Sequence, residues 1–282
     1  MVDVAIIGAG PAGIAAAIQL KRYDIEFMIF EKGKIGGLLR NANLVENYLG
    51  FPRGIRGREL VELFKEQLKN AGVKVQFEMV RELDYSGKFF IRADRERDCR
   101  VAIIASGTKP REYPVPSDVK DRVFYEVDQI STVSDEKVAI IGAGDAAFDY
   151  AINLSRENEV TILNRSNRVR CLPILWRRAM ECEKISYRNA QVKNIKSHGD
   201  GLMITCGGEF LYARYLLIAI GREPCLDFLS QNLTERYEKL QKVNVLYLVG
   251  DVKNNIYRQT AMSVGDGIRA AMEIDRNFGK GP

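Results

Sequence analysis

The sequence lacks the residues on which most metal centres and hydrolytic triads depend. Its 282 residues include a single histidine, His198, in a turn-like stretch. Without a second histidine we expect neither a histidine-based metal site nor a Ser/His catalytic arrangement. The chemistry of this chain must therefore depend on other groups.

Cysteine is also scarce. The five cysteines are Cys99, Cys171, Cys182, Cys206 and Cys225, and none of them forms a Cys-x-x-Cys pair. An odd, unpaired set favours a reducing compartment over a disulfide framework. Such cysteines are more often small buried side chains than reactive thiols.

Long apolar runs and tracts of a single charge are missing as well. The longest apolar stretches, Ile14–Leu20 and Tyr215–Ile220, fall well short of the roughly 20 residues that a membrane-spanning helix needs. Met1–Asp3 leads directly into a predicted strand, so we expect no secretion leader. The net charge of +5 is not gathered into a nucleic-acid-like tract. We expect a cytoplasmic protein that binds neither membranes nor nucleic acid.

Glycine, by contrast, is concentrated at two places half a chain apart. Gly8–Gly13 and Gly142–Ala147 both have the form Gly-x-Gly-x-x-Gly/Ala. Each follows an apolar run, Val4–Ile7 or Val138–Ile141, that predicts a buried parallel strand, and each opens a helical stretch. In such a fingerprint the first glycine permits a tight bend, and the second lets backbone N–H groups approach a pyrophosphate at the helix N-terminus. Two fingerprints predict two dinucleotide sites.

The residue at the tip of the next strand indicates which nucleotide the first site holds. The predicted strand Glu26–Phe30 ends in Glu31. A carboxylate there accepts hydrogen bonds from both ribose hydroxyls of an adenosine and repels a 2′-phosphate. The first site is therefore predicted to hold FAD or NAD.

The tip of the corresponding second-unit strand is basic instead. The predicted strand Glu159–Leu163 is followed by Asn164 and Arg165, and then by Arg168 and Arg170, with no acid at the tip. Guanidinium groups suit a 2′-phosphate. NADPH is the expected second nucleotide, with NADH and a merely solvated basic loop as the alternatives.

The remaining elements indicate how the two units share the chain. The length allows two domains, and the proline-bearing stretch Pro110–Pro116 is typical of a linker. The segment with the predicted strand Val245–Val249 does not complete the second unit, so we infer that it returns to the first. We predict an α/β protein with two Rossmann-like three-layer dinucleotide-binding domains, the second inserted into the first. The expected domains are 1–113 with 240–282 for FAD, and 114–239 for NAD(P)H.

Several motifs then occur along the chain in the same order as in a known protein family. They are the two fingerprints, Glu31, Gly36-Gly37, Val45–Tyr48 before Gly50–Pro52, Ser106–Thr108, Gly221–Pro224, Gly250-Asp251 and Tyr257–Ala261. In these the chain resembles the FAD-dependent pyridine nucleotide-disulfide oxidoreductases, specifically the low-molecular-weight thioredoxin reductase branch. The resemblance implies that Asp251 hydrogen-bonds the FAD ribitol. It also implies that Asn47 and the Arg258–Ala261 backbone border the isoalloxazine.

One departure from that family changes the expected chemistry. Thioredoxin reductases carry a Cys-x-x-Cys disulfide just ahead of the second fingerprint, where this chain has Tyr125–Asp128 and no thiol. A redox pair needs two adjacent sulfurs, so the chain cannot take electrons from a flavin as a dithiol in the usual way. A Tyr-x-Val-acid segment followed by Gly-Asp-x-Ala resembles the thioredoxin reductase-like ferredoxin:NADP reductases.

The implied reaction is hydride transfer between nicotinamide and flavin, for which the protein supplies orientation rather than an acid or base. We predict an FAD-dependent NAD(P)H oxidoreductase that passes electrons to a one-electron carrier such as ferredoxin or flavodoxin, or to a small acceptor. One alternative is a reductase of external low-molecular-weight disulfides. The other is a flavin-binding redox sensor or subunit with little turnover, whose Arg165–Arg178 surface docks a partner. The resemblance also implies a homodimer.

The candidate site residues follow from these motifs, and no metal ligands are among them. The flavin-framing residues expected to act in catalysis are Asn47, Asp128 and Thr260. The residues expected to contact FAD are Gly8, Gly10, Pro11, Ala12, Gly13, Glu31, Lys32, Gly36, Gly37, Leu38, Asn47, Ser106, Gly107, Thr108, Gly250, Asp251, Arg258, Gln259 and Thr260. Those expected to contact NAD(P)H are Gly142, Gly144, Asp145, Ala146, Asn164, Arg165 and Arg170.

Overall fold

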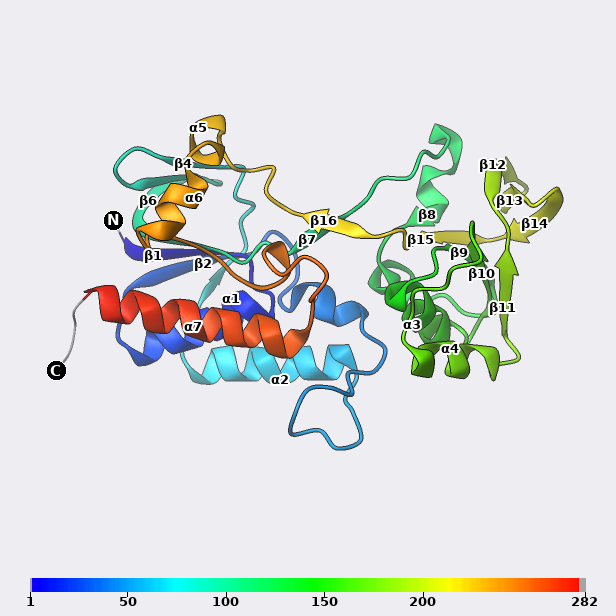
Figure 1. Ribbon diagram of the computed structural model, residues 1–282, viewed down its shortest axis with the longest axis horizontal. Coiled ribbons are helices and arrows are strands. Elements are labelled where there is room, and N and C mark those ends of the chain that lie inside the picture. The colour runs from blue at the N-terminus through cyan, green and yellow to red at the C-terminus, as the bar shows by residue number, and fades with distance from the viewer. Residues whose placement is uncertain (1, 279–282) are drawn as a thin grey trace. The chain divides into compact units, whose positions relative to one another are not determined.

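The computed structural model describes residues 2–278, which fall into two compact units (Figure 1). Among these residues the first unit consists of the stretch up to Arg40, Val45–Lys109 and the stretch from Glu223 onward. The second unit consists of Asn41–Leu44 and Pro110–Arg222. The predicted α/β fold, with one Rossmann-like unit inserted into another, is confirmed.

The first unit is built around a parallel sheet. β1 (Val2–Ile7) lies at its centre, with β2 (Phe27–Phe30) and β3 (Val75–Gln76) on one side. β6 (Glu96–Ile104) pairs with the other side of β1, and β17 (Leu246–Leu248) pairs with β6. The apolar runs of these strands are buried, as expected for a parallel sheet that is covered on both faces.

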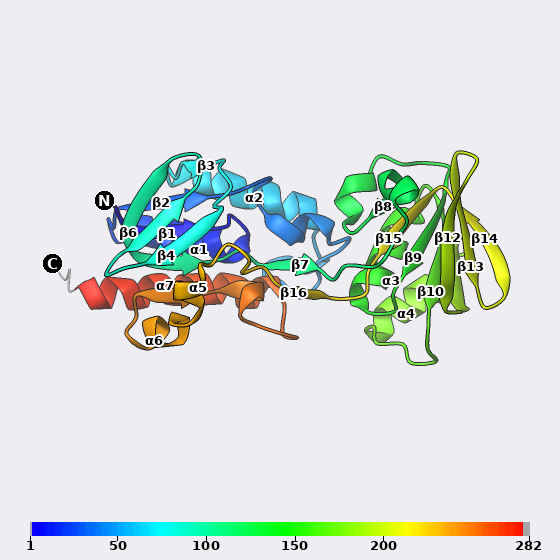
Figure 2. The ribbon, with the colours of Figure 1, turned by 90° about the horizontal axis from the view of Figure 1, so that it is seen from above.

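Helices cover this sheet and bring the end of the chain back to its beginning. α1 (Pro11–Arg22) and α2 (Gly57–Asn70) come from the first part of the chain, and α7 (Thr260–Phe278) lies along α1 (Figures 1 and 2). The two helices approach closely because α7 has a glycine at the contact. A Cβ on Gly267 would lie 2.1 Å from the carbonyl oxygen of Ala12.

The long strand β6 also carries an antiparallel extension. Its first half pairs with β5 (Phe89–Arg92), which pairs with β4 (Glu82–Tyr85). Burial alternates along β5, so one face of this extension packs on the core. β4 is absent from the sequence-based prediction because it is short and carries two acidic residues.

The predicted boundary at residue 240 is wrong, because residues 223–239 belong to the first unit. The short helices α5 (Gln231–Thr234) and α6 (Tyr237–Lys242) lie in this region. The Leu83 N–H donates to Phe228 O at 2.7 Å, and the Ser230 N–H donates to Leu83 O at 2.9 Å. Leu233 and Leu240 complete the core around Leu83. At the other boundary, residues 110–113 fall in the second unit.

The second unit repeats the plan with a wholly parallel sheet. In spatial order its strands are β11 (Ile185–Asn189), β10 (Glu159–Asn164), β9 (Lys137–Ile141), β15 (Tyr215–Ile218) and β8 (Val123–Phe124). α3 (Asp145–Leu154) follows β9, and α4 (Pro173–Met180) follows β10. A separate antiparallel sheet contains β12 (Val192–His198), β13 (Gly201–Cys206) and β14 (Glu209–Ala213).

Short elements complete the chain. β7 (Thr108–Pro110) and β16 (Arg222–Pro224), where the chain passes from one unit to the other and back, pair as a two-stranded sheet. The 3₁₀ turns are η1 (Gly37–Asn41), η2 (Ser117–Arg122), η3 (Val127–Ile130) and η4 (Gly250–Val252). No helix within residues 2–278 combines the length and the apolar character of a membrane span.

Candidate functional site

The turn between β1 and α1 has the shape of a phosphate cradle. Gly8 has a φ of 108°, and a Cβ there would lie 2.4 Å from the Ala105 oxygen. A Cβ on Gly13 would lie 1.9 Å from the Gly8 oxygen, so helix and strand can pack only around glycine. Among residues 2–278, no heavy atom except those of its chain neighbours lies within 4 Å of a Cβ placed on Gly10. This open space lies at the N-cap of α1, where a pyrophosphate fits.

Glu31 lies directly against this cradle. It follows the last residue of β2, and its carboxylate accepts the N–H of Ala9 at 2.9 Å and the N–H of Gly33 at 2.8 Å. These bonds hold the carboxylate beside the fingerprint, within the region that an adenosine ribose would enter. Lys32 follows Glu31 in the chain, at the exposed edge of the same region.

The glycine pair after β2 lies next to the same fingerprint. The Gly36 N–H donates to Ala9 O at 2.8 Å, and Gly36 has a φ of 97° with its α-carbon against Val61. A Cβ on Gly37 would lie 3.5 Å from the Gly10 α-carbon. Leu38 follows within η1. The predicted members of this loop therefore border the cradle.

The predicted flavin-framing residues of the first unit come together from opposite ends of the chain. The Asn47 amide donates to Gln259 Oε1 at 2.8 Å across 212 positions. Thr260 begins α7 beside Gln259, preceded by the half-buried Arg258. Asp251 accepts the Ser263 hydroxyl at 3.3 Å. The other predicted catalytic residue, Asp128, belongs to the second unit.

The Ser106–Thr108 motif has a structural role that its sequence did not indicate. The Ser106 hydroxyl donates to Cys225 O at 2.7 Å, and the Cys225 N–H donates to Gly107 O at 3.1 Å. Thr108 then begins β7. These bonds join the segment through which the chain leaves the first unit to the segment through which it returns.

The second fingerprint has the same geometry as the first. Gly142 has a φ of 145°, and a Cβ there would lie 2.2 Å from the Ala219 oxygen. Around Gly144, within the described chain, a Cβ would again meet no heavy atom inside 4 Å except those of the neighbouring residues. α3 begins at the next residue, followed by Ala146. With β9 flanked by β10 and β15, this turn lies at the crevice where open α/β sheets bind nucleotides.

The segment after β10, residues 165–172, is named here the arginine loop. Arg165, Arg168 and Arg170 are exposed on it, and none of them forms an ion pair with a carboxylate in the part of the chain that the structure describes. The Arg170 N–H donates to Ala143 O at 2.8 Å, which brings the loop against the second fingerprint. Three unneutralised guanidinium groups beside a phosphate cradle suit a phosphorylated ligand.

Two residues expected to contact the nucleotide form hydrogen bonds with the loop. The Asp145 carboxylate accepts the Leu172 N–H at 2.7 Å. Asn164 is only 5% exposed, and its amide donates to Arg168 O at 3.2 Å. Polar side chains suit these two positions because they form hydrogen bonds with backbone groups of the loop, which lie outside the sheet.

The thiol-free segment Tyr125–Asp128 is held by a polar network. Glu126 and Gln129 form a reciprocal capping box around η3. The Glu126 carboxylate also accepts from Arg222 Nη1 and from Asn41 Nδ2, both at 2.5 Å. The Asp128 N–H donates to Asn41 Oδ1 at 3.1 Å. Sequence motifs gave no signal for this network, since its members lie far apart in the chain.

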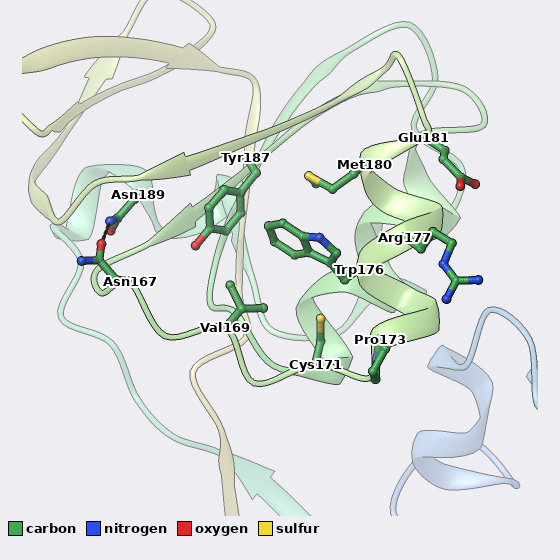
Figure 3. Close-up of a pocket in the computed structure, with 10 residues that line it drawn as sticks. All are labelled: Asn167, Val169, Cys171, Pro173, Trp176, Arg177, Met180, Glu181, Tyr187 and Asn189. Carbon is green, nitrogen blue, oxygen red and sulfur yellow. Dashed lines mark hydrogen bonds between the residues drawn. The ribbon is translucent and has the colours of Figure 1, made fainter.

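A cavity of about 870 Å³ lies on the other side of the arginine loop (Figure 3). Trp176 of α4 and Tyr187 of β11 lie next to each other in its lining, with Val169 and Cys171 of the loop close by. None of the residues predicted to contact a nucleotide lines this cavity.

Asp149 on α3 provides a test of the electrostatics in this unit. Burial, opposed by the Asn43 N–H at 2.9 Å and aided by the charge of Asp145, raises the pKa of Asp149 from an ordinary 3.8 to about 6. The folded protein therefore holds this proton more tightly than the unfolded chain, and the free energy of unfolding falls as pH rises from about 4 to about 6.

Replacing Asp149 with asparagine should raise the free energy of unfolding at pH 7 by about 1–3 kcal/mol, with little change at pH 4. The substitution removes the buried charge and keeps an acceptor for the Asn43 N–H. Urea unfolding of variant and wild type at both pH values measures the difference. Asp118→Asn, at an exposed aspartate of the same unit, is the control. An equal effect at both pH values would contradict the prediction.

Comparison with known proteins agrees with this geometry. Residues 2–267 match the family described as pyridine nucleotide-disulphide oxidoreductase. Thioredoxin reductase of Mycolicibacterium smegmatis is 30% identical over 298 residues, which cover 97% of this chain and 96% of that protein. Thioredoxin reductase of Chlamydia pneumoniae is 29% identical, covering 97% and 98%. The structure of Lactococcus lactis thioredoxin reductase matches with a TM-score of 0.86, at 27% identity and 98% coverage of both chains.

A more distant structure shares the fold. Bacillithiol disulfide reductase of Staphylococcus aureus matches with a TM-score of 0.75 at 22% identity, over 98% of both chains. The thioredoxin reductase-like members of the family use FAD and NADPH. Two glycine cradles, each with room for a phosphate, fit that pair of nucleotides. The chain belongs to the pyridine nucleotide-disulphide oxidoreductase family, as a thioredoxin reductase-like FAD- and NAD(P)H-dependent oxidoreductase.

Proposed function

We propose that this chain is an NADPH-dependent flavoprotein that passes electrons from FAD directly to an external acceptor, without a dithiol of its own. The observation that carries this proposal is the segment Tyr125–Asp128. It stands where the resemblance to thioredoxin reductases implies two cysteines, and its Glu126 is bonded to Arg222 and Asn41. A carboxylate network cannot accept electrons, so the flavin is the last redox group on the electron path within the chain.

Three of the five cysteines elsewhere in the chain are poorly suited to act as a substitute. All five lie within the described residues and are free thiols. Burial raises the pKa of the Cys99 thiol to about 12 and also raises the pKa of Cys171 and Cys206. Redox-active cysteines need the opposite shift, toward the thiolate.

The two cradles are proposed to bind different cofactors. The first, with Gly10 and Glu31, would hold the FAD phosphates and ribose, and Asn47, Asp251 and Thr260 would border the rest of that cofactor. FAD held by these residues would supply the capacity to take up a hydride and to pass electrons on, and the residues would bind and orient it. Asp128, which belongs to the second unit, is proposed as a further catalytic residue.

The second cradle is proposed to hold the NADPH phosphates at Gly144, with Arg165 and Arg170 at the 2′-phosphate. The arginines favour NADPH over NADH because their guanidinium groups can bond the 2′-phosphate, which NADH lacks. All other groups of the two nucleotides are the same. A preference for NADPH should therefore depend on how the arginine loop contacts the 2′-phosphate.

The acceptor is proposed to be a one-electron carrier, such as ferredoxin or flavodoxin, or a small molecule. The net charge of +5 complements an acidic carrier protein. We place this reaction in the cytoplasm and expect the chain to act as a homodimer.

Anaerobic titration tests the central claim through electron stoichiometry. One NADPH carries two electrons, which is the capacity of one FAD, so one equivalent should bleach the flavin completely. A chain with an additional redox dithiol would consume a second equivalent. Blocking the thiols with iodoacetamide beforehand should leave the titration unchanged. Consumption of two equivalents by the untreated protein, or no bleaching by either nucleotide, contradicts the proposal.

An acceptor panel then identifies the class of substrate. The reduced protein should be reoxidised rapidly by ferredoxin or flavodoxin under anaerobic conditions. Faster turnover with low-molecular-weight disulfides would favour the disulfide reductase alternative. Reduction by NADPH without turnover of any acceptor would favour a redox sensor.

A further inference from the structure

The arginine loop is anchored at both ends by hydrogen bonds, two of which join it to the second fingerprint. At its far end the Asp145 carboxylate accepts the Leu172 N–H at 2.7 Å, and the Arg170 N–H donates to Ala143 O. At its near end the loop depends on Asn164, the last residue of β10. A loop fixed in this way presents its side chains from a rigid backbone.

Both polar atoms of the Asn164 amide form hydrogen bonds that hold the near end of the loop. Its Oδ1 accepts the Ser166 N–H at 3.3 Å, and its Nδ2 donates to Arg168 O at 3.2 Å. Nδ2 also donates to the Tyr187 hydroxyl oxygen at 2.9 Å. Since Asn164 is nearly fully buried, loss of these bonds would leave polar groups without water or protein partners.

Tyr187 is held in turn by the core of the second unit. Its ring lies edge-on to Trp176, with centroids 5.2 Å apart (Figure 3). It also stacks on the fully buried Phe148, with centroids 6.3 Å apart. The packing fixes the hydroxyl, so Tyr187 connects the aromatic core to the loop. The neighbouring Asn189 of β11 donates from its amide Nδ2 to Asn167 Oδ1 in the loop (Figure 3).

We infer that Tyr187 and Asn164 are positioning residues that determine the nucleotide preference without touching the nucleotide. They hold the arginine loop in the conformation in which Arg165 and Arg170 meet a 2′-phosphate beside Gly144. A preordered loop loses less conformational entropy on binding, so its charge-assisted bonds contribute more to affinity. This inference rests on the proposed function, in which the donor is NADPH.

Calorimetric titration of the Tyr187→Phe holoprotein tests the inference with two fragments of the nucleotide. Adenosine 2′,5′-bisphosphate carries the distinguishing phosphate, and adenosine 5′-monophosphate lacks it. The Kd of the bisphosphate should rise about three- to tenfold, the usual effect of losing one hydrogen bond, while the Kd of the monophosphate stays unchanged. The KM for NADPH should rise by the same factor with kcat unchanged.

A matched tyrosine provides the control. Tyr212 lies on β14, outside the arginine loop, and its hydroxyl donates to Asp200 at 2.7 Å. Removing this hydroxyl in Tyr212→Phe should change neither Kd. Asn164→Asp keeps the size of the side chain and removes both donors, so it should weaken bisphosphate binding more than Tyr187→Phe. Circular dichroism melting identifies any variant that fails to fold.

The outcomes separate this inference from the proposed function. An unchanged bisphosphate Kd in Tyr187→Phe, in a protein whose Arg165→Gln/Arg170→Gln variant loses bisphosphate affinity, overturns the positioning role alone. Equal binding of both fragments by the wild type overturns the NADPH assignment and this inference together. Weakening of both fragments by Tyr187→Phe indicates general damage and likewise overturns the inference.

Discussion

Replacing Gly10 with valine is expected to give a folded but colourless protein. In the structure a Cβ at this position enters open space, and Gly10 has an ordinary φ of −77°, so the apoprotein tolerates the side chain. A bound pyrophosphate would need that space and the backbone N–H groups around it. Loss of two charge-assisted hydrogen bonds, each worth about 1.5–3 kcal/mol, corresponds to at least about a 100-fold rise in the Kd for FAD.

The corresponding position in the second unit supplies the control. Gly144→Val fills the equivalent space, so this variant should keep its flavin and its yellow colour but resist bleaching by NADPH. Flavin absorbance after purification, calorimetry with added FAD and circular dichroism melting check both variants. A Gly10→Val protein with the flavin content of the wild type would show that the first cradle does not hold FAD.

Replacing Arg165 and Arg170 together with glutamine should raise the KM for NADPH by about 30- to 100-fold and change the KM for NADH by less than about twofold. This expected rise in KM is smaller than the loss of two full-strength charge-assisted hydrogen bonds would give, because both arginines are exposed and solvent screens their charges. Steady-state kinetics with both nucleotides measures the ratio.

A charge-matched variant separates the specific effect from a general one. Lys193→Gln/Lys196→Gln removes two exposed positive charges on β12 of the same unit and should leave both KM values unchanged. If the arginine variant keeps the wild-type preference between the nucleotides, the assignment of the arginine loop to a 2′-phosphate is wrong.

The sequence predicted the two cradles well because their cause is local. Gly8 and Gly142 require positive φ, and a Cβ on either would collide with the neighbouring strand, so the glycines mark the turns wherever the rest of the chain goes. The apolar runs before them could form only buried strands. Fold class and cradle positions follow from such short-range constraints.

The sequence did not predict the long-range polar contacts. Asn41 and Glu126 are 85 positions apart, and nothing in either neighbourhood indicates the other. Asn164 carried the opposite difficulty, since its place at a strand tip suggested contact with the nucleotide, whereas its burial turns the amide toward the loop. Residues 223–239 were assigned to the wrong unit because their short helices carry little periodicity, and their contact with Leu83 spans much of the chain.

The pairing of β7 with β16 bears on how one domain can be carried within another. The chain leaves the first unit and re-enters it at adjacent points, where the Arg111 N–H donates to Gly221 O at 3.0 Å. The segment Pro110–Arg222, the larger part of the second unit, therefore begins and ends side by side. A segment whose ends meet can be joined to a host domain like a surface loop, so its size places no demand on the strands of the host sheet.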